Sequence, residues 1–475
     1  MLRGALLAAS IAAPASAQVE PGPAASSPTE AWQPPTLTIT RYDEHWGRLA
    51  ARGARTDHWT GPFKYVPIGS GDVYLVTGIE LRARNEDNRN NLGSDAPAKD
   101  DSYLWLRAMP YSDLHAGRLR IFVQPIATYA VGVSPSPSPI DQTGTDLLQG
   151  FADIRVGSGE TGSTNGNGLT LRAGRQMLTL GTERLVGTRY GPNVPLAFDG
   201  LRGLLSLSGA TVSLLAVRPV QPGPASFDDR RSRSRSLWGA YATVPGVASG
   251  TGIDLYYLGY RNTTATFGGR TGSELRHSLG ARFYGAAASW HWNIEAVAQV
   301  GRFADGPIAA WTLGTEIGHA FPDAPLSPDV ELRFNIVSGD KRRGDERLGT
   351  FNALFPKGKY FGELSPVGPT NIISANPRIT TALGGGASAS LAGMAYWRYS
   401  LEDGVYDIPG NLVRAPGTAT ARFIGKEVEA TLAWQVTPEL ELSSSLSAFI
   451  PGNFIRQTGQ AKTIAMLGLE SNFRF

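Results

Sequence analysis

The stretch SWHWNIEAVAQ, residues 289–299, alternates apolar with polar side chains. Successive side chains of a β-strand point to opposite faces. One face of this strand would carry Trp290, Trp292, Ile294, Ala296 and Ala298. The other face would carry Ser289, His291, Asn293, Glu295 and Gln299. This pattern over about ten residues is typical of a strand that crosses a membrane as part of a barrel.

The same alternation recurs in other segments, for example at residues 330–337, 427–436 and 439–450. A soluble β-sandwich also alternates, so the lengths of the connections are needed to separate the two folds. Gaps after odd-numbered segments are long, at residues 85–101, 132–145, 219–236, 262–274 and 338–372. Most even-numbered gaps are short, as at residues 112–117, 207–211, 284–289 and 436–439. Long external loops that alternate with short periplasmic turns favour the membrane barrel.

We therefore predict an all-β fold, a transmembrane antiparallel β-barrel of about 18 strands, formed as a single barrel domain by residues 70–475. The end of the chain agrees, because Leu467, Leu469, Phe473 and Phe475 share one strand face and the last residue is aromatic. The long gap at 338–377 is rich in Gly and Pro, which excludes a regular strand. We expect it to fold inward, with Phe351, Phe355, Tyr360 and Phe361 as anchors and with Lys357 and Lys359 facing the passage.

The start of the chain predicts export. Residues 1–17 combine Arg3, an apolar stretch and a small-residue run, the pattern of a secretory signal peptide. Residues 18–69 are expected to be an N-terminal leader and periplasmic entry segment. The chain has no cysteine, and its hydrophobic content of 41% is too low for a helical membrane protein of this size. The predicted location is the cell outer membrane, with outer-membrane lipid and lipopolysaccharide as surroundings.

Arginines recur on the polar faces of the predicted strands. In DVYLVTGIELRAR, residues 72–84, apolar positions face lipid and leave Glu80, Arg82 and Arg84 on the inner face. Arg107, Arg172, Arg202 and Arg333 follow the same logic, because a lipid-facing arginine at the midplane costs about 2 to 4 kcal/mol. Guanidinium groups bind carboxylates, so several of them around a lumen would favour anions. The alternative is that they form salt bridges with acidic neighbours and only fill the lumen.

Several segments carry a resemblance to a known family. They are FKYVPIGSGDVYLVTGIELRARNE (63–86), LTLRAGRQMLTLGTERLVG (169–187), FDGLRG (198–203), SGDKRRGDERLGTFNALFPKGKYFGE (338–363), AYWRYS (395–400) and FIGKEVEATLAWQVTPELELS (423–443). Together they resemble the bacterial alginate export family, and the segment 350–363 is the most specific part. The resemblance implies an 18-stranded outer-membrane barrel that passes alginate through an arginine-lined constriction.

By the same resemblance, basic side chains within or beside the matching segments are pore-lining candidates. They are Lys64, Arg82, Arg84, Arg172, Arg175, Arg184, Arg202, Lys359 and Arg398, with Asp199 and Glu363 as acidic neighbours. Arg175 has the strand parity of Leu171, so it faces inward only if a bulge lies near Gly174.

The predicted function is a channel for anionic polysaccharide, such as an alginate-like polyuronate, or for small anions. Periplasmic polysaccharide-handling proteins are possible partners. Two alternatives stay open: a general anion-selective or uptake porin, and a structural or adhesive barrel. No HExxH or GxSxG motif occurs, so we predict no enzyme, metal or cofactor. The tract DDRRSRSRS, residues 228–236, is interpreted as a solvated loop or as a site for lipopolysaccharide phosphates, and no nucleic acid partner is expected.

Overall fold

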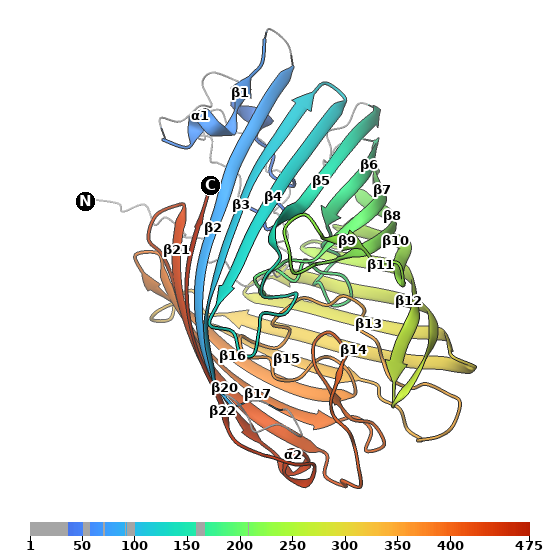
Figure 1. Ribbon diagram of the computed structural model, residues 1–475. Coiled ribbons are helices and arrows are strands. Elements are labelled where there is room, and N and C mark those ends of the chain that lie inside the picture. The colour runs from blue at the N-terminus through green and yellow to red at the C-terminus, as the bar shows by residue number, and fades with distance from the viewer. Residues whose placement is uncertain are drawn as a thin grey trace.

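The barrel is formed by one antiparallel sheet that closes on itself (Figure 1). The computed structural model describes residues 37–50, 58–69, 72–90, 92, 100–157, 167–207 and 209–475. The first wall strand, β2, pairs with both β3 and the last strand, β22, and this second pairing closes the wall. The predicted signal peptide and the residues up to 36 lie outside the described part of the chain.

Eighteen strands among the described residues form the wall, as the sequence predicted. They are β2 (Val73–Arg89), β3 (Asp101–Ala116), β4 (Leu119–Val131), β5 (Gly144–Gly157), β6 (Gly168–Met177), β7 (Ala197–Leu207), β8 (Ala210–Gln221), β10 (Arg235–Pro245), β11 (Thr251–Phe267), β12 (Arg270–Ala287), β13 (Trp290–Phe303), β14 (Gly306–Ala320), β15 (Asp329–Val337), β16 (Ile372–Gly384), β17 (Ala387–Arg398), β20 (Phe423–Gln435), β21 (Leu440–Pro451) and β22 (Ile464–Arg474). The short elements outside the wall are η1 (Gly47–Ala50), α1 (Gly61–Lys64), β1 (Val66–Pro67), β9 (Arg230–Arg231), β18 (Val405–Tyr406), β19 (Leu412–Arg414) and α2 (Asn453–Gln457). None of the helices in the described part of the chain is long and apolar enough to cross a membrane.

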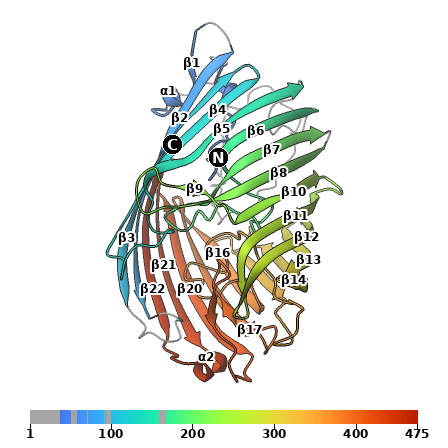
Figure 2. The ribbon, with the colours of Figure 1, turned by 45° about the vertical axis from the view of Figure 1, so that its right-hand side comes forward.

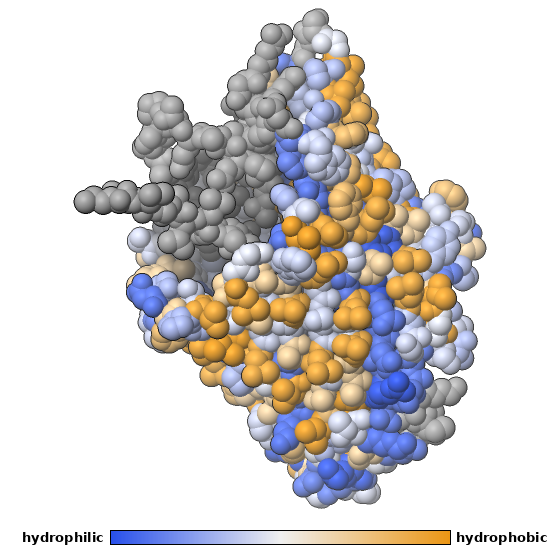
Figure 3. Space-filling model, turned by 90° about the vertical axis from the view of Figure 1, so that its left-hand side faces the viewer, coloured by the Kyte–Doolittle hydropathy of each residue, from blue (hydrophilic) through white to orange (hydrophobic). Residues whose placement is uncertain are grey.

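The alternating faces have the predicted orientation. On β13, Trp290 is 53% exposed on the outside, whereas Glu295 and Gln299 are buried inside. Apolar side chains on the outer face favour lipid, and the polar inner face needs water or hydrogen-bond partners. One face of the molecule accordingly shows hydrophobic residues gathered over the barrel wall (Figure 3).

The connections mostly follow the predicted order of long loops and short turns. The odd-numbered connections include residues 132–143, 222–234 and 338–371. The long gap predicted at 262–274 is wrong, because β11 and β12 continue to Phe267 and Arg270 and meet in a tight turn. Gly268 and Gly269, both with positive φ, allow this turn. The residues before the turn are polar, which indicates that this hairpin extends beyond the membrane.

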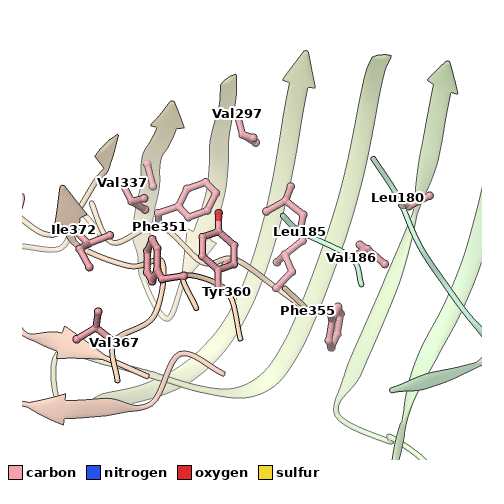
Figure 4. Close-up of a cluster of buried hydrophobic side chains, with 14 of the residues drawn as sticks. Leu180, Leu185, Val186, Val297, Val337, Phe351, Phe355, Tyr360, Val367 and Ile372 are labelled. Carbon is pink, nitrogen blue, oxygen red and sulfur yellow. The ribbon is translucent and has the colours of Figure 1, made fainter. Parts of the chain in front are cut away.

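Two long connections, residues 178–196 between β6 and β7 and residues 338–371 between β15 and β16, fold into the barrel. We call them the inner loops. They are joined by backbone hydrogen bonds, from Phe355 N to the Leu185 carbonyl at 2.9 Å and from Lys357 N to the Glu183 carbonyl at 2.9 Å. Figure 4 shows Leu185 and Val186 of the first inner loop close to Phe355 and Tyr360 of the second. Their apolar side chains form one buried cluster with the inner wall.

The N-terminal segment 37–50 also packs inside the barrel. Tyr42 contacts the rings of Phe122 and Phe151 on the inner wall, and its hydroxyl donates to the Met177 carbonyl at 2.8 Å. This segment was predicted to belong to the periplasmic leader before residue 70, so the part of the chain associated with the barrel begins earlier than expected. Residues 61–67, α1 and β1, lie instead at the end of the barrel where β2 begins (Figure 2).

Candidate solute site in the barrel interior

A small polar pocket lies where the inner loops meet the wall strands β13 to β16. Its volume is about 40 Å³. Its lining comes from both inner loops and the wall: Thr182, Arg184, Asn293, Thr315, Glu316, Arg333, Asn335, Lys357, Tyr360, Phe361 and Asn376. We call it the lumen pocket. Three of its charged side chains are cationic and only Glu316 is acidic, so the lining itself is positive.

Arg184 reaches the lumen pocket from the first inner loop. Its Nε lies 3.1 Å from a Glu295 oxygen, and its Nη1 donates to Asn335 at 3.0 Å and to the Tyr360 hydroxyl at 2.7 Å. These bonds hold the guanidinium in a fixed orientation. The guanidinium lines the lumen pocket, and Glu295 offsets part of its charge.

Arg333 reaches the lumen pocket from the wall strand β15. It lies between two acidic groups, with Nε 3.0 Å from a Glu316 oxygen and 2.7 Å from a Glu331 oxygen. The two carboxylates neutralise much of its charge. Arg333 therefore orders the wall of the pocket more than it adds net positive charge.

Lys357 supplies the cation that has no ion-pair partner among the described residues. Burial lowers the pKa of its ammonium group to about 8. The nearby charge of Arg333 also lowers this pKa, whereas the charges of Glu316 and Glu183 raise it. Half-buried and unpaired, this ammonium group is the most available charge for an anion in the pocket.

Asn376, the register partner of Arg333 on β16, adds neutral hydrogen-bonding capacity. It is 5% exposed, lines the lumen pocket, and both its amide nitrogen and its amide oxygen lack a hydrogen-bond partner within the described part of the chain. A buried amide without partners is costly, and a hydroxylated solute would satisfy it.

Most of the other predicted arginines anchor segments inside the barrel. Arg82 donates to the carbonyls of Tyr190, Gly191 and Pro192, and Arg107 donates to two of the same carbonyls while it pairs with Glu80 at 2.6 Å. The Tyr190 hydroxyl donates to the second Glu80 oxygen at 2.7 Å. Glu80, Arg82 and Arg107 therefore hold the first inner loop against β2 and β3.

Arg84, Lys359 and Glu363 form a second anchor, for the other inner loop. Arg84 contacts Glu363 at 2.8 Å and also Glu86 and Glu470, while Lys359 contacts Glu363 at 2.5 Å. Burial alone would raise the pKa of Glu363, but Lys359 and Arg84 lower it to about 2. The carboxylate is thus charged at neutral pH, and the loop is tied to β2.

Arg172 and Lys64 face the interior but are covered, and Arg202 faces the interior and is half-buried. The Arg172 guanidinium pairs with Asp153 at 2.8 Å and stacks on the rings of Tyr42 and Phe151. Arg202, its register partner, donates to the Ser213 hydroxyl at 2.7 Å. Lys64, the last residue of α1, is buried and donates to the Tyr111 hydroxyl at 2.8 Å. The N-terminal segment, which we expected outside the barrel, covers Arg172.

Arg398 organises another long connection, residues 399–422. It donates to the backbone carbonyls of Leu401, Asp403, Ala419 and Ala421, and its guanidinium lies over the Phe454 ring. It is fully buried by these contacts. Arg398 was predicted to line the passage, but the structure places it at the end of β17, enclosed by this connection.

Arg175 and Asp199 require a correction. Both have the outward parity of Leu171 and of Leu201, which is 62% exposed, and they pair with one another at 2.8 Å. Arg175 also donates to the carbonyls of Leu147 and Asp229. Gly174 has a positive φ, but the strand does not reverse its faces there, so this pair lies outside the lumen.

Three lumen residues were not singled out from the sequence: Glu316, Asn376 and Arg378. Strand alternation places Glu316 on the inner face of β14, so the signal was present. Asn376 lies within the gap predicted at 338–377 and Arg378 directly follows it, because Pro377 between them argues against a strand. Here the barrel wall tolerates the proline.

Comparison with solved structures identifies the fold as that of outer-membrane porins. OpdK of Pseudomonas aeruginosa, solved with vanillate, matches with a TM-score of 0.55 and 14% identity over 84% of this chain and 98% of that chain. OccK2 (OpdF) of the same organism, in complex with glucuronate, matches with a TM-score of 0.54 and 14% identity over 84% and 98%. OccK8 (OprE), also from this organism, gives a TM-score of 0.55 at 12% identity over 84% and 98%. A search of curated proteins finds no match.

The fold and the charged interior define an outer-membrane β-barrel of the transport-channel class. The model of the alginate export family matches residues 73–466, from the first wall strand into the last. The chain belongs to the alginate export family, and its location is the cell outer membrane.

Proposed function

We propose that this channel passes carboxylate-bearing saccharides, with an alginate-like polyuronate as its cargo, and that each carboxylate is received at the lumen pocket. The observation that carries the proposal is Lys357, an unpaired cation beside two oriented guanidinium groups. A cation set in a narrow, water-poor passage raises the local concentration of anions.

The neutral groups of the pocket favour a saccharide over a simple anion. Asn376 offers an amide donor and an acceptor that are both without partners, and Tyr360 and Thr182 add hydroxyl groups. Sugar hydroxyls both donate and accept, so they match such a lining. Glucuronate, a uronate, is the ligand named for OccK2, a porin of the same fold.

A volume of about 40 Å³ holds only a few water molecules, because one water needs about 10 to 15 Å³ of such space. A hexuronate ring is larger than this, so passage requires the inner loops to move relative to the wall. The second candidate function, uptake of small anions, is favoured by the same narrowness, because small solutes need less movement.

Single-channel recording in planar bilayers separates these functions. We expect anion selectivity in a salt gradient, and current block that strengthens from glucuronate to longer oligouronates but is absent with neutral oligosaccharides of equal length. Lys357→Gln should weaken both effects, and Arg347→Gln, in an exposed part of the same loop, should leave them unchanged. Permeation of glucuronate with no block by oligomers would identify a small-anion porin. Cation selectivity of the unmodified channel would refute both functions.

A further inference from the structure

Three arginines point outward from the wall near the end that bears the long loops. They are Arg218 on β8, Arg261 on β11 and Arg302 on β13. Leu275 lies between Arg261 and Arg302 and is the register partner of both. Neighbouring strands are about 4.8 Å apart, so two arginines with one strand between them are separated by roughly 10 Å. We call these three residues the arginine row.

The arginine row is exposed and mostly unpaired. No ion pair joins Arg218, Arg261 or Arg302 to an acidic group within the described residues, and Arg302 donates only to the Asp305 backbone carbonyl. Asp199 is the register partner of Arg218, but Arg175 holds both of its oxygens, at 2.8 and 3.1 Å. The outer face here therefore carries a local excess of positive charge.

The level of the row relative to the membrane follows from β13. Trp290 lies at the short-turn end of this strand, and Val300, two residues before Arg302, is 52% exposed on the same outer face. A membrane-spanning strand needs about 9 to 11 residues to cross the hydrocarbon region. The stretch from Trp290 to Val300 fulfils this requirement, so the arginine row lies just beyond the hydrocarbon, at the headgroup level of the outer leaflet.

An open apolar groove of about 810 Å³ lies on β10 to β14, on the membrane side of the row. Its lining includes the small residues Ala281, Ala296 and Ala298 and larger side chains such as Leu279 and Trp311. Ala298 is four residues from Arg302, which corresponds to roughly 13 Å along the strand. The groove thus lies within the bilayer, one headgroup length below the row.

Polar aromatic groups occupy the level between row and groove. The Tyr257 hydroxyl and His277 Nδ1 are 2.8 Å apart, and the Trp238 ring lies over Gly259, where a Cβ would meet it at 2.2 Å. Aromatic side chains with one polar edge prefer the membrane interface.

We propose that the arginine row and the groove bind a phosphorylated lipid of the outer leaflet, the lipid A part of lipopolysaccharide. The guanidinium groups receive its phosphates and the groove receives an acyl chain. Guanidinium forms two parallel hydrogen bonds to phosphate, and within the described residues neither Arg261 nor Arg302 is in an ion pair. Free phosphate would leave the groove without a ligand, and an uncharged lipid would leave the arginine row without one.

The test measures lipid binding to the purified full chain in detergent by native mass spectrometry. The probes are bisphosphorylated lipid A, dephosphorylated lipid A and inorganic phosphate. We compare the triple variant Arg218→Gln, Arg261→Gln and Arg302→Gln with the control Arg118→Gln, Arg342→Gln and Arg347→Gln, which has the same change in net charge at exposed sites elsewhere. We expect about fivefold weaker binding of lipid A for each arginine lost from the row, and on the order of a hundredfold for all three.

A groove variant tests the acyl chain separately. Ala296→Phe fills the groove without a change in charge and should weaken lipid A binding about tenfold, the equivalent of about two buried methylene groups. Ala173→Phe, at an outward position away from the groove, should have no effect.

Several results would overturn the proposal. They are equal binding of dephosphorylated lipid A, an equal loss in the control triple variant, and displacement of lipid A by inorganic phosphate. If Ala296→Phe dissociates an oligomer and leaves lipid binding intact, the groove is a contact between copies of the chain, and the proposal is wrong.

Discussion

Arg184 Nη1 donates to the Tyr360 hydroxyl at 2.7 Å and so joins two inner loops whose sequence positions are 176 residues apart. The same guanidinium contacts Glu295 and Asn335 on the wall. One residue thus links both loops to β13 and β15 at the edge of the lumen pocket. The proposed passage of a saccharide includes movement of these loops, and movement of either loop must break or carry these contacts.

The first prediction separates the hydrogen bond from the charge. Tyr360→Phe removes one hydrogen bond, worth about 1 kcal/mol, so the balance between closed and open loop positions should shift about fivefold toward open. We expect more frequent opening in single-channel records and an unchanged reversal potential. Arg184→Gln should alter both opening and reversal potential. If the reversal potential changes equally in both variants, the charge of Arg184 does not contribute to selectivity.

The sequence predicts the strands of the barrel wall much better than the contacts made by the loops inside the barrel. Strand alternation depends on local side-chain direction, so the inward positions of Arg82, Arg107, Arg172 and Arg333 could be read directly. What each arginine contacts depends on loops that return from distant sequence positions. The carbonyls that bind Arg82 belong to residues 190–192, and strand periodicity carries no information about them.

The N-terminal segment shows the same limit. Tyr42 covers Arg172, although composition alone made the residues before 70 resemble a leader. The prediction of a long gap at 262–274 was wrong for the opposite reason. A strand that extends beyond the membrane loses the apolar alternation by which it would be recognised.

The second prediction concerns Arg172, which we first expected to select anions. Its pairing with Asp153 and its cover by Tyr42 now predict a structural role. Arg172→Gln should leave the reversal potential unchanged and destabilise the barrel by about 3 kcal/mol, because Asp153 loses the nearer of its two buried arginine partners. Urea unfolding in lipid vesicles measures the stability. If the reversal potential of Arg172→Gln shifts toward cation selectivity while its stability stays normal, Arg172 contributes to anion selectivity.

The third prediction concerns the second inner loop. Deletion of residues 350–363 removes Phe351, Phe355 and Tyr360 from the buried cluster, and with them Lys357 from the lumen pocket. We expect higher conductance and a lower preference for anions. Folding is checked by insertion into vesicles and by heat-dependent mobility on gels. An inserted variant with unchanged current would show that this loop lies outside the conduction path.

The fourth prediction tests which end faces the medium. Arg230, Arg231 and Arg233 are exposed in the connection 222–234, an odd-numbered one. Trypsin added to intact cells should cut there, and Arg118, in a turn at the opposite end, should be cut only after the outer membrane is permeabilised. Cleavage at Arg118 in intact cells would mean that the barrel has the reverse orientation.

The last prediction uses the titration of Lys357. Because burial lowers the pKa of its ammonium group to about 8, the group is charged below this pH and neutral above it. Arginines keep their charge throughout this range, and Glu363, with a pKa of about 2, stays ionised. Anion selectivity should therefore decrease as the pH rises from 7 to 9, with its midpoint near 8. Lys357→Met should show the low selectivity at every pH in this range, and Lys357→Arg should keep the high selectivity up to pH 9. The measurement is the reversal potential in a fixed salt gradient, and the effect should weaken at high salt, because the Debye length is about 3 Å at 1 M. If the pH dependence persists in Lys357→Met, another group titrates in the passage and the lumen pocket does not depend on this lysine.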